Sequence, residues 1–321
     1  MENLEIIFLL LGLVALLAIL SDRYRFPLPI VLVVVGLAIS FIPGLPLIVL
    51  DPEVVFLLFL PPLLYSAAWY TDWREFRENL RPILLAGVGL VFFTTVVVAW
   101  AARSIVPSLS WAEAFLLGAI VSPPDAVAAT SVTKGLGIHK RIIAIMEGES
   151  LINDAAGLVA YRYALAAVLT GTFGIWEAGL QFLWVAGAGV ALGIVVGRLI
   201  LLLHKHLTDN PVIETSLTLL SPYIAYLLAE HWHISGVLAV VALGLYLTGR
   251  ASSVFGTQSR LHTYAVWDVL VFILNGSVFI LIGLQLKYIL NEIASYSLLE
   301  LMGYGLAVSL IVIVVRFVWV Y

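Results

Sequence analysis

Long apolar runs without charge constrain this chain more than any other feature. Residues 82–102 and 178–197 contain no charged side chain, and a helix crosses the hydrocarbon core of a bilayer in about 20 residues. Apolar residues make up 62% of the 321 residues and charged residues 11%, whereas about 25% of the residues of a soluble domain are charged. These proportions exclude a water-soluble globule and predict an all-α polytopic membrane protein.

Eleven apolar segments follow one another along the chain, and each predicts a transmembrane helix. A β-barrel would show alternating segments of about ten residues instead. The segments are 4–20, 28–48, 54–70, 82–102, 114–132, 142–170, 178–200, 214–230, 234–249, 265–289 and 298–321. Because no linker or soluble domain interrupts them, we expect a single membrane transport domain over residues 1–321.

Basic residues indicate the orientation of these helices, since Lys and Arg accumulate in cytoplasmic connections. Twelve of the 16 Lys and Arg residues lie in the odd-numbered connections. This split predicts an N-terminus outside the cell and a location in the inner or plasma membrane. The net charge of −4, without a basic stripe, predicts no nucleic-acid partner.

Catalysis finds little support in the sequence. The absence of cysteine excludes disulfides and thiol chemistry. Residues 148–150 (GES) suggest a serine nucleophile, but that motif needs glycine where this chain has Ile152. We therefore expect no enzyme and no cofactor, and an intramembrane hydrolase stays a distant alternative.

The sixth segment contains the most unusual residues. Four ionisable side chains lie within it: Glu147, Glu149, Asp154 and Arg162. Each costs about 2.5–3.5 kcal/mol at the centre of a membrane on insertion scales. A lipid-facing helix would not carry this cost, so the segment is predicted to lie in the protein interior, facing a cavity or a partner.

Helical spacing brings oxygen ligands together on this segment. Ser150, Asp154 and Gly157 share a face, and Asn153 lies beside Asp154. Carboxylate, amide and hydroxyl oxygens suit a hard cation. We therefore predict a site at Asp154 and Asn153, with Ser150, that holds either a proton or a monovalent cation. The alternative is that Asp154 only forms an interhelical salt bridge with an arginine.

The fifth segment contains two adjacent prolines followed by Asp125. Pro123 and Pro124 remove two backbone donors, so the helix over 114–132 is predicted to break near mid-membrane. Broken membrane helices expose backbone groups to transported ions. The simpler alternative is a proline kink without a role in ion binding.

Four motifs resemble the sodium/proton exchangers, in particular their NhaP-like branch. They are GESLIND at 148–154, SPPDAV at 122–127, FLPP at 59–62, and YIAYLLAE at 223–230 followed by Ser235 and Gly236. The resemblance implies thirteen helices in two inverted repeats, with a dimer-forming scaffold and a core that carries the ion by an elevator-like movement. Within that scheme 1–80 and 178–290 form the scaffold, whereas 82–172 and 298–321 belong to the core.

The same resemblance implies roles for individual residues. Asp154 would exchange the ion and the proton, and Asn153 would be its neutral partner, as in the electroneutral branch. Asp125 would orient the broken crossing and help Asn153. Glu149 would form a structural ion pair with Arg316. Where many bacterial relatives have a threonine before the aspartate of segment five, this chain has Pro124, so that hydroxyl ligand is missing.

The sequence as a whole predicts a secondary active antiporter that exchanges a proton for sodium or another monovalent cation. One exchangeable carboxylate implies electroneutral exchange, and the resemblance implies a homodimer in the lipid bilayer. Because the last residue lies in segment eleven, the resemblance implies that helices twelve and thirteen are missing from residues 1–321, and we expect these residues alone not to transport. The alternative function is a cation channel lined by Asp125 and Asp154.

Overall fold

The protein is almost entirely helical. A computed structural model describes residues 2–42, 52–125, 137–171, 175–206, 210–250, 255–292 and 297–321, and the secondary structure in these ranges consists of helices alone. The first of them are α1 Glu2–Tyr24, α2 Leu28–Ser40, α3 Pro52–Tyr70, α4 Trp73–Glu78, α5 Leu80–Leu84, the π-helix η1 Leu85–Leu90, α6 Val91–Ile105 and α7 Trp111–Val121. The later ones are α9 Lys140–Thr170, α10 Ile175–His206, α11 Pro211–His231, α12 Gly236–Thr248, α14 Thr257–Glu292 and α15 Leu298–Val320.

Each of the eleven expected segments contains a helix, which confirms the fold class. Six of the described helical stretches are long and apolar enough to cross a membrane, and three shorter helices are also apolar. Helix α9 has 31 residues, but it carries six charged side chains, four of which lie within the predicted segment 142–170. Residues 43–48 of the second segment lie outside the described residues.

The fourth segment is not one regular α-helix. It runs as α5, η1 and α6, with the π-helical turn over Leu85–Leu90. A Cβ atom on Gly87 would lie 2.9 Å from Cβ of Ile152 and 3.1 Å from the carbonyl oxygen of Glu149. The irregular turn therefore brings this segment close to the backbone of α9. Insertions of this kind are frequent at functional sites.

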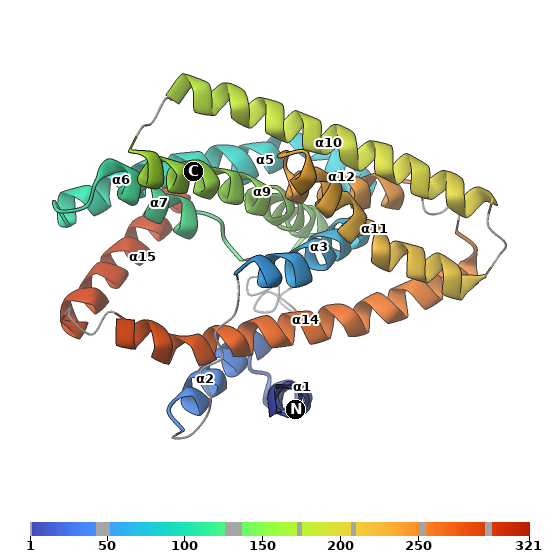
Figure 1. Cartoon of the computed structure of the whole chain (residues 1–321), viewed down its shortest axis with the longest axis horizontal. Coiled ribbons are helices and arrows are strands. Elements are labelled where there is room, and N and C mark those ends of the chain that lie inside the picture. Colours follow the sequence, from blue (N-terminus) through green and yellow to red (C-terminus); the bar gives the residue numbers. More distant parts are fainter. Residues whose placement is uncertain are drawn as a thin grey trace.

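The largest hydrophobic core joins α3, α10, α11, α12 and α14, and it also includes Phe76 of α4, Ile83 of α5 and Leu151 of α9. Tyr65, Trp69 and Trp267 are buried at its centre, and the Tyr65 ring lies against both tryptophan rings. A second cluster, around Val14, Leu32 and Ile280, joins α1 and α2 to α14. Figure 1 shows α14 passing between these two groups. Burial of apolar side chains in both clusters stabilises this half of the molecule.

Glycines allow several of these helices to approach closely. Gly189, Gly193 and Gly197 follow one face of α10, and Cβ atoms on them would lie within 3 Å of Ser235, Ala239 and Tyr246 respectively. This spacing of small residues is typical of closely packed membrane helices. The glycines of segment seven therefore form a contact with α12, which we call the α10–α12 seam.

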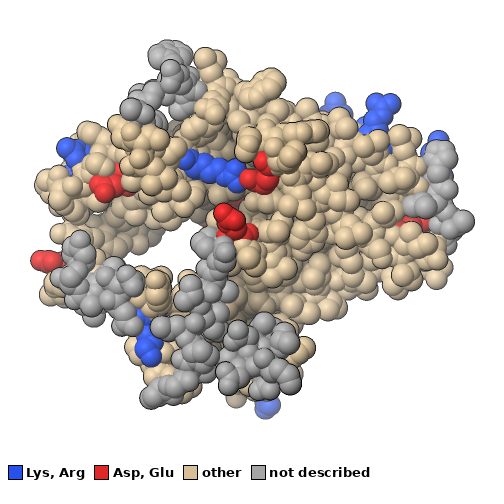
Figure 2. All heavy atoms as spheres, viewed as in Figure 1, with Lys and Arg blue, Asp and Glu red and all other residues tan. Residues whose placement is uncertain are grey.

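The helices α5, η1, α6, α7 and α9 form a second packed group, which α15 joins through α6 and which α9 connects to the larger core through α3, α4 and α12. In Figure 1 this group lies toward one end of the molecule, with the C-terminus beside it. Figure 2 shows few charged side chains on the visible face, and uncharged residues cover most of it. This distribution fits a protein surrounded by lipid.

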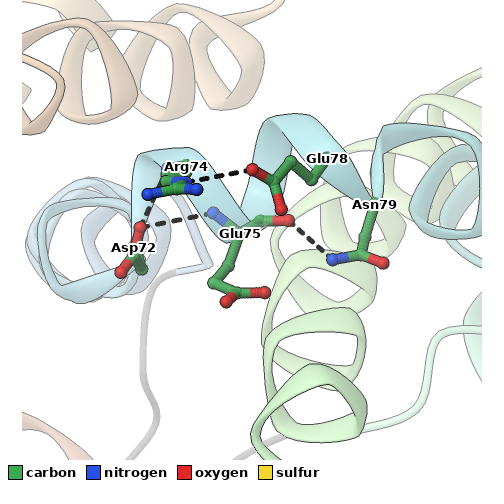
Figure 3. Close-up of polar contacts among 5 residues, drawn as sticks. All are labelled: Asp72, Arg74, Glu75, Glu78 and Asn79. Carbon is green, nitrogen blue, oxygen red and sulfur yellow. Dashed lines mark hydrogen bonds and ion pairs between the residues drawn. The ribbon is translucent and has the colours of Figure 1, made fainter.

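The start of α9 is held by the short helix α4. Figure 3 shows Asp72 accepting hydrogen bonds at the N-terminus of α4 and the exposed pair Arg74–Glu78 on its surface. At the other end of α4, Asn79 Nδ2 donates to the carbonyl oxygen of Glu75 at 2.8 Å. Its Oδ1 accepts from Arg141 Nε at 2.8 Å, so Asn79 ties α4 to the first turn of α9.

Candidate ion-binding site

Helix α7 ends where the prolines begin. Ser110 caps its N-terminus in a capping box with Glu113. The last residue of the helix is Val121, Ser122 caps it with its backbone N–H donating to the carbonyl oxygen of Gly118, and Pro123, Pro124 and Asp125 follow outside the helix. The predicted break of segment five is thus present on its N-terminal side. Its continuation over 126–136 lies outside the described residues.

Asn153 connects this broken segment to α9. Its side chain is fully buried, and Nδ2 donates to the carbonyl oxygen of Pro124 at 3.3 Å. The amide oxygen Oδ1 has no hydrogen-bond partner among the described residues. A buried polar atom without a partner costs about 1–3 kcal/mol. That cost gives the oxygen a reason to bind a cation or a water molecule.

Asp154 lies next to Asn153 on α9 and is half-buried. Its carboxylate is close enough to that of Asp125 for a direct charge interaction. Within the described ranges three ion pairs occur, and Asp154 takes part in none of them. The structure therefore does not show the salt bridge with arginine that was the alternative for Asp154. Ser150 lies one turn earlier and is also half-buried.

The two arginines inside membrane segments each contact a glutamate. Arg316 Nη2 on α15 donates to Glu149 Oε1 at 2.7 Å, and only 7% of the Glu149 side chain is exposed. Arg162 Nη2 on α9 donates to Glu230 Oε1 on α11, also at 2.7 Å. The second pair had no signal in the sequence, because its residues are 68 positions apart.

The site thus offers oxygen atoms of several kinds. Carboxylates come from Asp154 and Asp125, an amide oxygen from Asn153 and a backbone carbonyl from Pro124. Such hard oxygen donors are suited to alkali and alkaline-earth cations rather than to soft transition metals. Among the described residues no three His, Cys, Asp or Glu side chains gather as a metal cluster. The arrangement suits a transported ion held by few protein charges.

Comparison with protein families decides the assignment. The family described as "sodium/hydrogen exchanger, transmembrane" matches residues 9–321. The chain belongs to this family. The prediction from the sequence motifs, membership of the sodium/proton exchangers, is therefore confirmed.

Curated relatives of the chain are described as antiporters. The sodium, potassium, lithium and rubidium/H⁺ antiporter of Bacillus pumilus is 34% identical over 99% of this chain and 49% of its own length. The Na⁺/H⁺ antiporter ApNhaP of Aphanothece halophytica is 37% identical over 89% of this chain and 56% of its own. The chain thus spans about half the length of the curated relatives it matches.

A solved structure shares the fold. The sodium proton antiporter MjNhaP1 from Methanocaldococcus jannaschii superposes with a TM-score of 0.71 over 88% of this chain and 70% of that protein. The sequence identity is 18%, so the likeness concerns the fold alone. It agrees with the all-α architecture expected from the NhaP-like motifs.

Proposed function

We propose that this chain carries the ion site of a secondary active antiporter that exchanges a proton for sodium or another monovalent cation. The observation that carries the proposal is that, among the described residues, the Asp154 carboxylate forms no ion pair and the buried amide oxygen of the neighbouring Asn153 has no hydrogen-bond partner. A carboxylate without a permanent cationic partner is free to bind H⁺ or a metal cation in turn. The antiporters among the relatives favour this function over a channel.

Competition for one carboxylate explains coupling. A proton and a cation cannot occupy the same oxygen atoms together, so binding of one displaces the other. Exchange of one H⁺ for one monovalent cation moves no net charge, which makes the cycle electroneutral. Displacement of one ion by another involves neither electron nor group transfer, so the cycle needs no cofactor.

The surrounding residues take supporting roles in this proposal. Asn153 contributes its amide oxygen to the cation, and Ser150 adds a hydroxyl one turn away. Asp125 increases the negative charge around Asp154 and so attracts cations into the site. Glu149 and Arg316 fix α9 against α15 as a structural ion pair. These assignments divide α9 into binding positions and anchoring positions.

The setting of the transporter follows from charge and packing. We place it in the inner or plasma membrane with its N-terminus outside, because basic residues gather in the odd-numbered connections. The helices of residues 1–80 and 178–290 serve as the scaffold of a homodimer, and those of residues 82–172 and 298–321 serve as the mobile core. A thiol-labelling experiment with single cysteines in the connections tests the orientation.

The central test measures displacement of a proton by sodium. The purified chain is placed in lipid nanodiscs with a pH-sensitive dye in weak buffer, and NaCl is added against choline chloride as the ionic-strength control. We expect sodium-dependent release of a proton from the wild-type chain and none from Asp154→Asn. Across a pH series the release should pass through a maximum. At low pH sodium cannot displace the proton from Asp154, and at high pH Asp154 carries no proton to displace.

A second acid-to-amide variant serves as the matched control. Asp268 is exposed on α14, where it accepts a hydrogen bond from the Tyr70 hydroxyl at 2.6 Å. Asp268→Asn should release protons as the wild type does. Sodium-dependent release that persists in Asp154→Asn would remove this residue from the centre of the mechanism. Uncoupled cation current across a bilayer would instead support the channel.

A further inference from the structure

A glycine on α9 makes an unusually close contact with the broken segment. Gly157 is buried, and a Cβ atom built on it would lie 2.2 Å from Cγ of Pro123 and 3.3 Å from its Cδ. Carbon atoms normally approach to about 3.5–4.0 Å. The proline ring is closed onto the backbone and cannot turn away. Only glycine at position 157 therefore allows Pro123 to lie where it does.

A second glycine fixes the opposite side of the same segment. A Cβ atom on Gly118 of α7 would lie 2.4 Å from the carbonyl oxygen of Thr95 on α6. The Thr95 hydroxyl also donates to the Ser122 hydroxyl at 3.2 Å, and both residues are buried. The end of α7 is thus held between α6 and α9 just before the two prolines.

This packing determines where the Pro124 carbonyl lies. Asn153 and Gly157 are four residues apart, so they share one face of α9. Pro123 rests on Gly157, and the adjacent Pro124 presents its carbonyl oxygen to Asn153 Nδ2 at 3.3 Å. That distance is already slightly longer than the usual range of 2.7–3.2 Å. A displacement of Pro123 by a methyl group would therefore break the hydrogen bond.

We propose that Gly157 is a positioning residue: it seats the ring of Pro123 so that Pro124 orients the amide of Asn153 beside Asp154. The inference rests on the proposed function, because it concerns the same ion site. It predicts that one methyl group added at position 157 weakens cation binding, although no charge changes and every ion-binding side chain is kept. Cation binding weakens because the Asn153 amide turns once its hydrogen bond to the Pro124 carbonyl oxygen is broken.

The test compares three glycine-to-alanine variants in nanodiscs. Gly157→Ala changes the seat of Pro123. Gly193→Ala creates a clash at the α10–α12 seam that is at least as severe, since its Cβ would lie 2.1 Å from the Ala239 carbonyl oxygen. Gly187→Ala adds a methyl group where no atom lies within 4 Å. Each is measured for thermal unfolding and for the sodium concentration that gives half-maximal proton release.

Gly157→Ala is expected to raise that sodium concentration by about tenfold, which corresponds to about 1.4 kcal/mol of binding free energy. Gly193→Ala should lower the unfolding temperature yet keep the wild-type sodium concentration, and Gly187→Ala should change neither. Equal loss of sodium binding in Gly157→Ala and Gly193→Ala would show general destabilisation and overturn the proposal. Wild-type binding by Gly157→Ala would overturn it as well.

Removal of the ring provides a second variant if Gly157→Ala folds poorly. Pro123→Ala eliminates the Cγ atom that the new methyl group would meet. The double variant Gly157→Ala, Pro123→Ala should therefore bind sodium within about threefold of Pro123→Ala alone, a coupling that a double-mutant cycle measures. Additive losses from the two changes would contradict the contact.

A separate readout distinguishes this inference from the proposed function. The chain contains no cysteine, so Ser122→Cys supplies a single buried thiol at the end of α7. A small thiol reagent should modify it about tenfold faster in the Gly157→Ala background, and at an unchanged rate with Gly193→Ala, because burial controls access to a thiol. If the wild type releases no proton, the proposed function fails, and the labelling rates still decide whether Gly157 seats Pro123.

Discussion

The α10–α12 seam and the contact between α7 and α9 are both built on glycine, yet they have different consequences. At the seam two continuous helices approach one another, and their backbone groups are satisfied within each helix. At the second contact α7 ends at Val121, so a backbone carbonyl and a side-chain amide meet beside an acidic residue. The same close packing stabilises one region and positions the residues of the proposed ion site in the other.

The largest expected effect sharpens the structural side of this comparison. Gly193→Val inserts a branched side chain against the backbone of α12, where even a Cβ atom would lie 2.1 Å from the Ala239 carbonyl oxygen. We expect the free energy of unfolding to fall by about 3 kcal/mol, the upper range for overpacking. Denaturation in detergent measures it, with Gly187→Val as control. A wild-type unfolding curve would mean that the seam is not closely packed.

An intermediate effect is expected at the ion pair beside the site. Arg316→Met leaves the buried Glu149 carboxylate without its partner, although Arg316 is itself 41% exposed. We expect the free energy of unfolding to fall by about 1–2 kcal/mol. Adding Glu149→Gln should recover part of this loss, because the unpaired charge disappears. If the double variant regains none of the lost free energy of unfolding, Arg316 acts through its other contacts.

The smallest effect is expected at the pair that joins α9 to α11. The side chains of Arg162 and Glu230 are 47% and 34% exposed, and partly solvated pairs contribute at most about 1 kcal/mol. Arg162→Met should therefore change unfolding by less than this and leave sodium-dependent proton release intact. A double-mutant cycle with Glu230→Gln measures the coupling. Loss of proton release would extend the ion site toward α11.

The sequence predicted the helices and the unusual character of segment six well, for a physical reason. Charge inside a membrane segment is so costly that Glu149, Asp154 and Arg162 identify an interior helix without any structure. Adjacent prolines similarly predict the end of α7, since they remove donors that a helix needs. Both inferences depend only on the residue types and on their neighbours in the chain.

Other features depend on contacts between distant residues. The sequence predicted a helix over 82–102, and the structure adds a π-helical turn at Leu85–Leu90 that lies against α9. The Arg162–Glu230 pair and the support of Pro123 by Gly157 join positions that no spacing rule connects. A Gly, Pro or Arg has many roles, and only its neighbours in space select one of them.

The sequence by itself determined that this chain crosses a membrane as helices, that segment five breaks and that segment six carries an acid in the interior. Those properties follow from the free energy of placing each residue in lipid, which depends mainly on the residue and its neighbours in the chain. Only the tertiary structure decided that Asp154 forms no ion pair among the described residues and which carbonyl meets Asn153. These outcomes follow from distances of a few ångströms between separate helices, where one methyl group changes the contact.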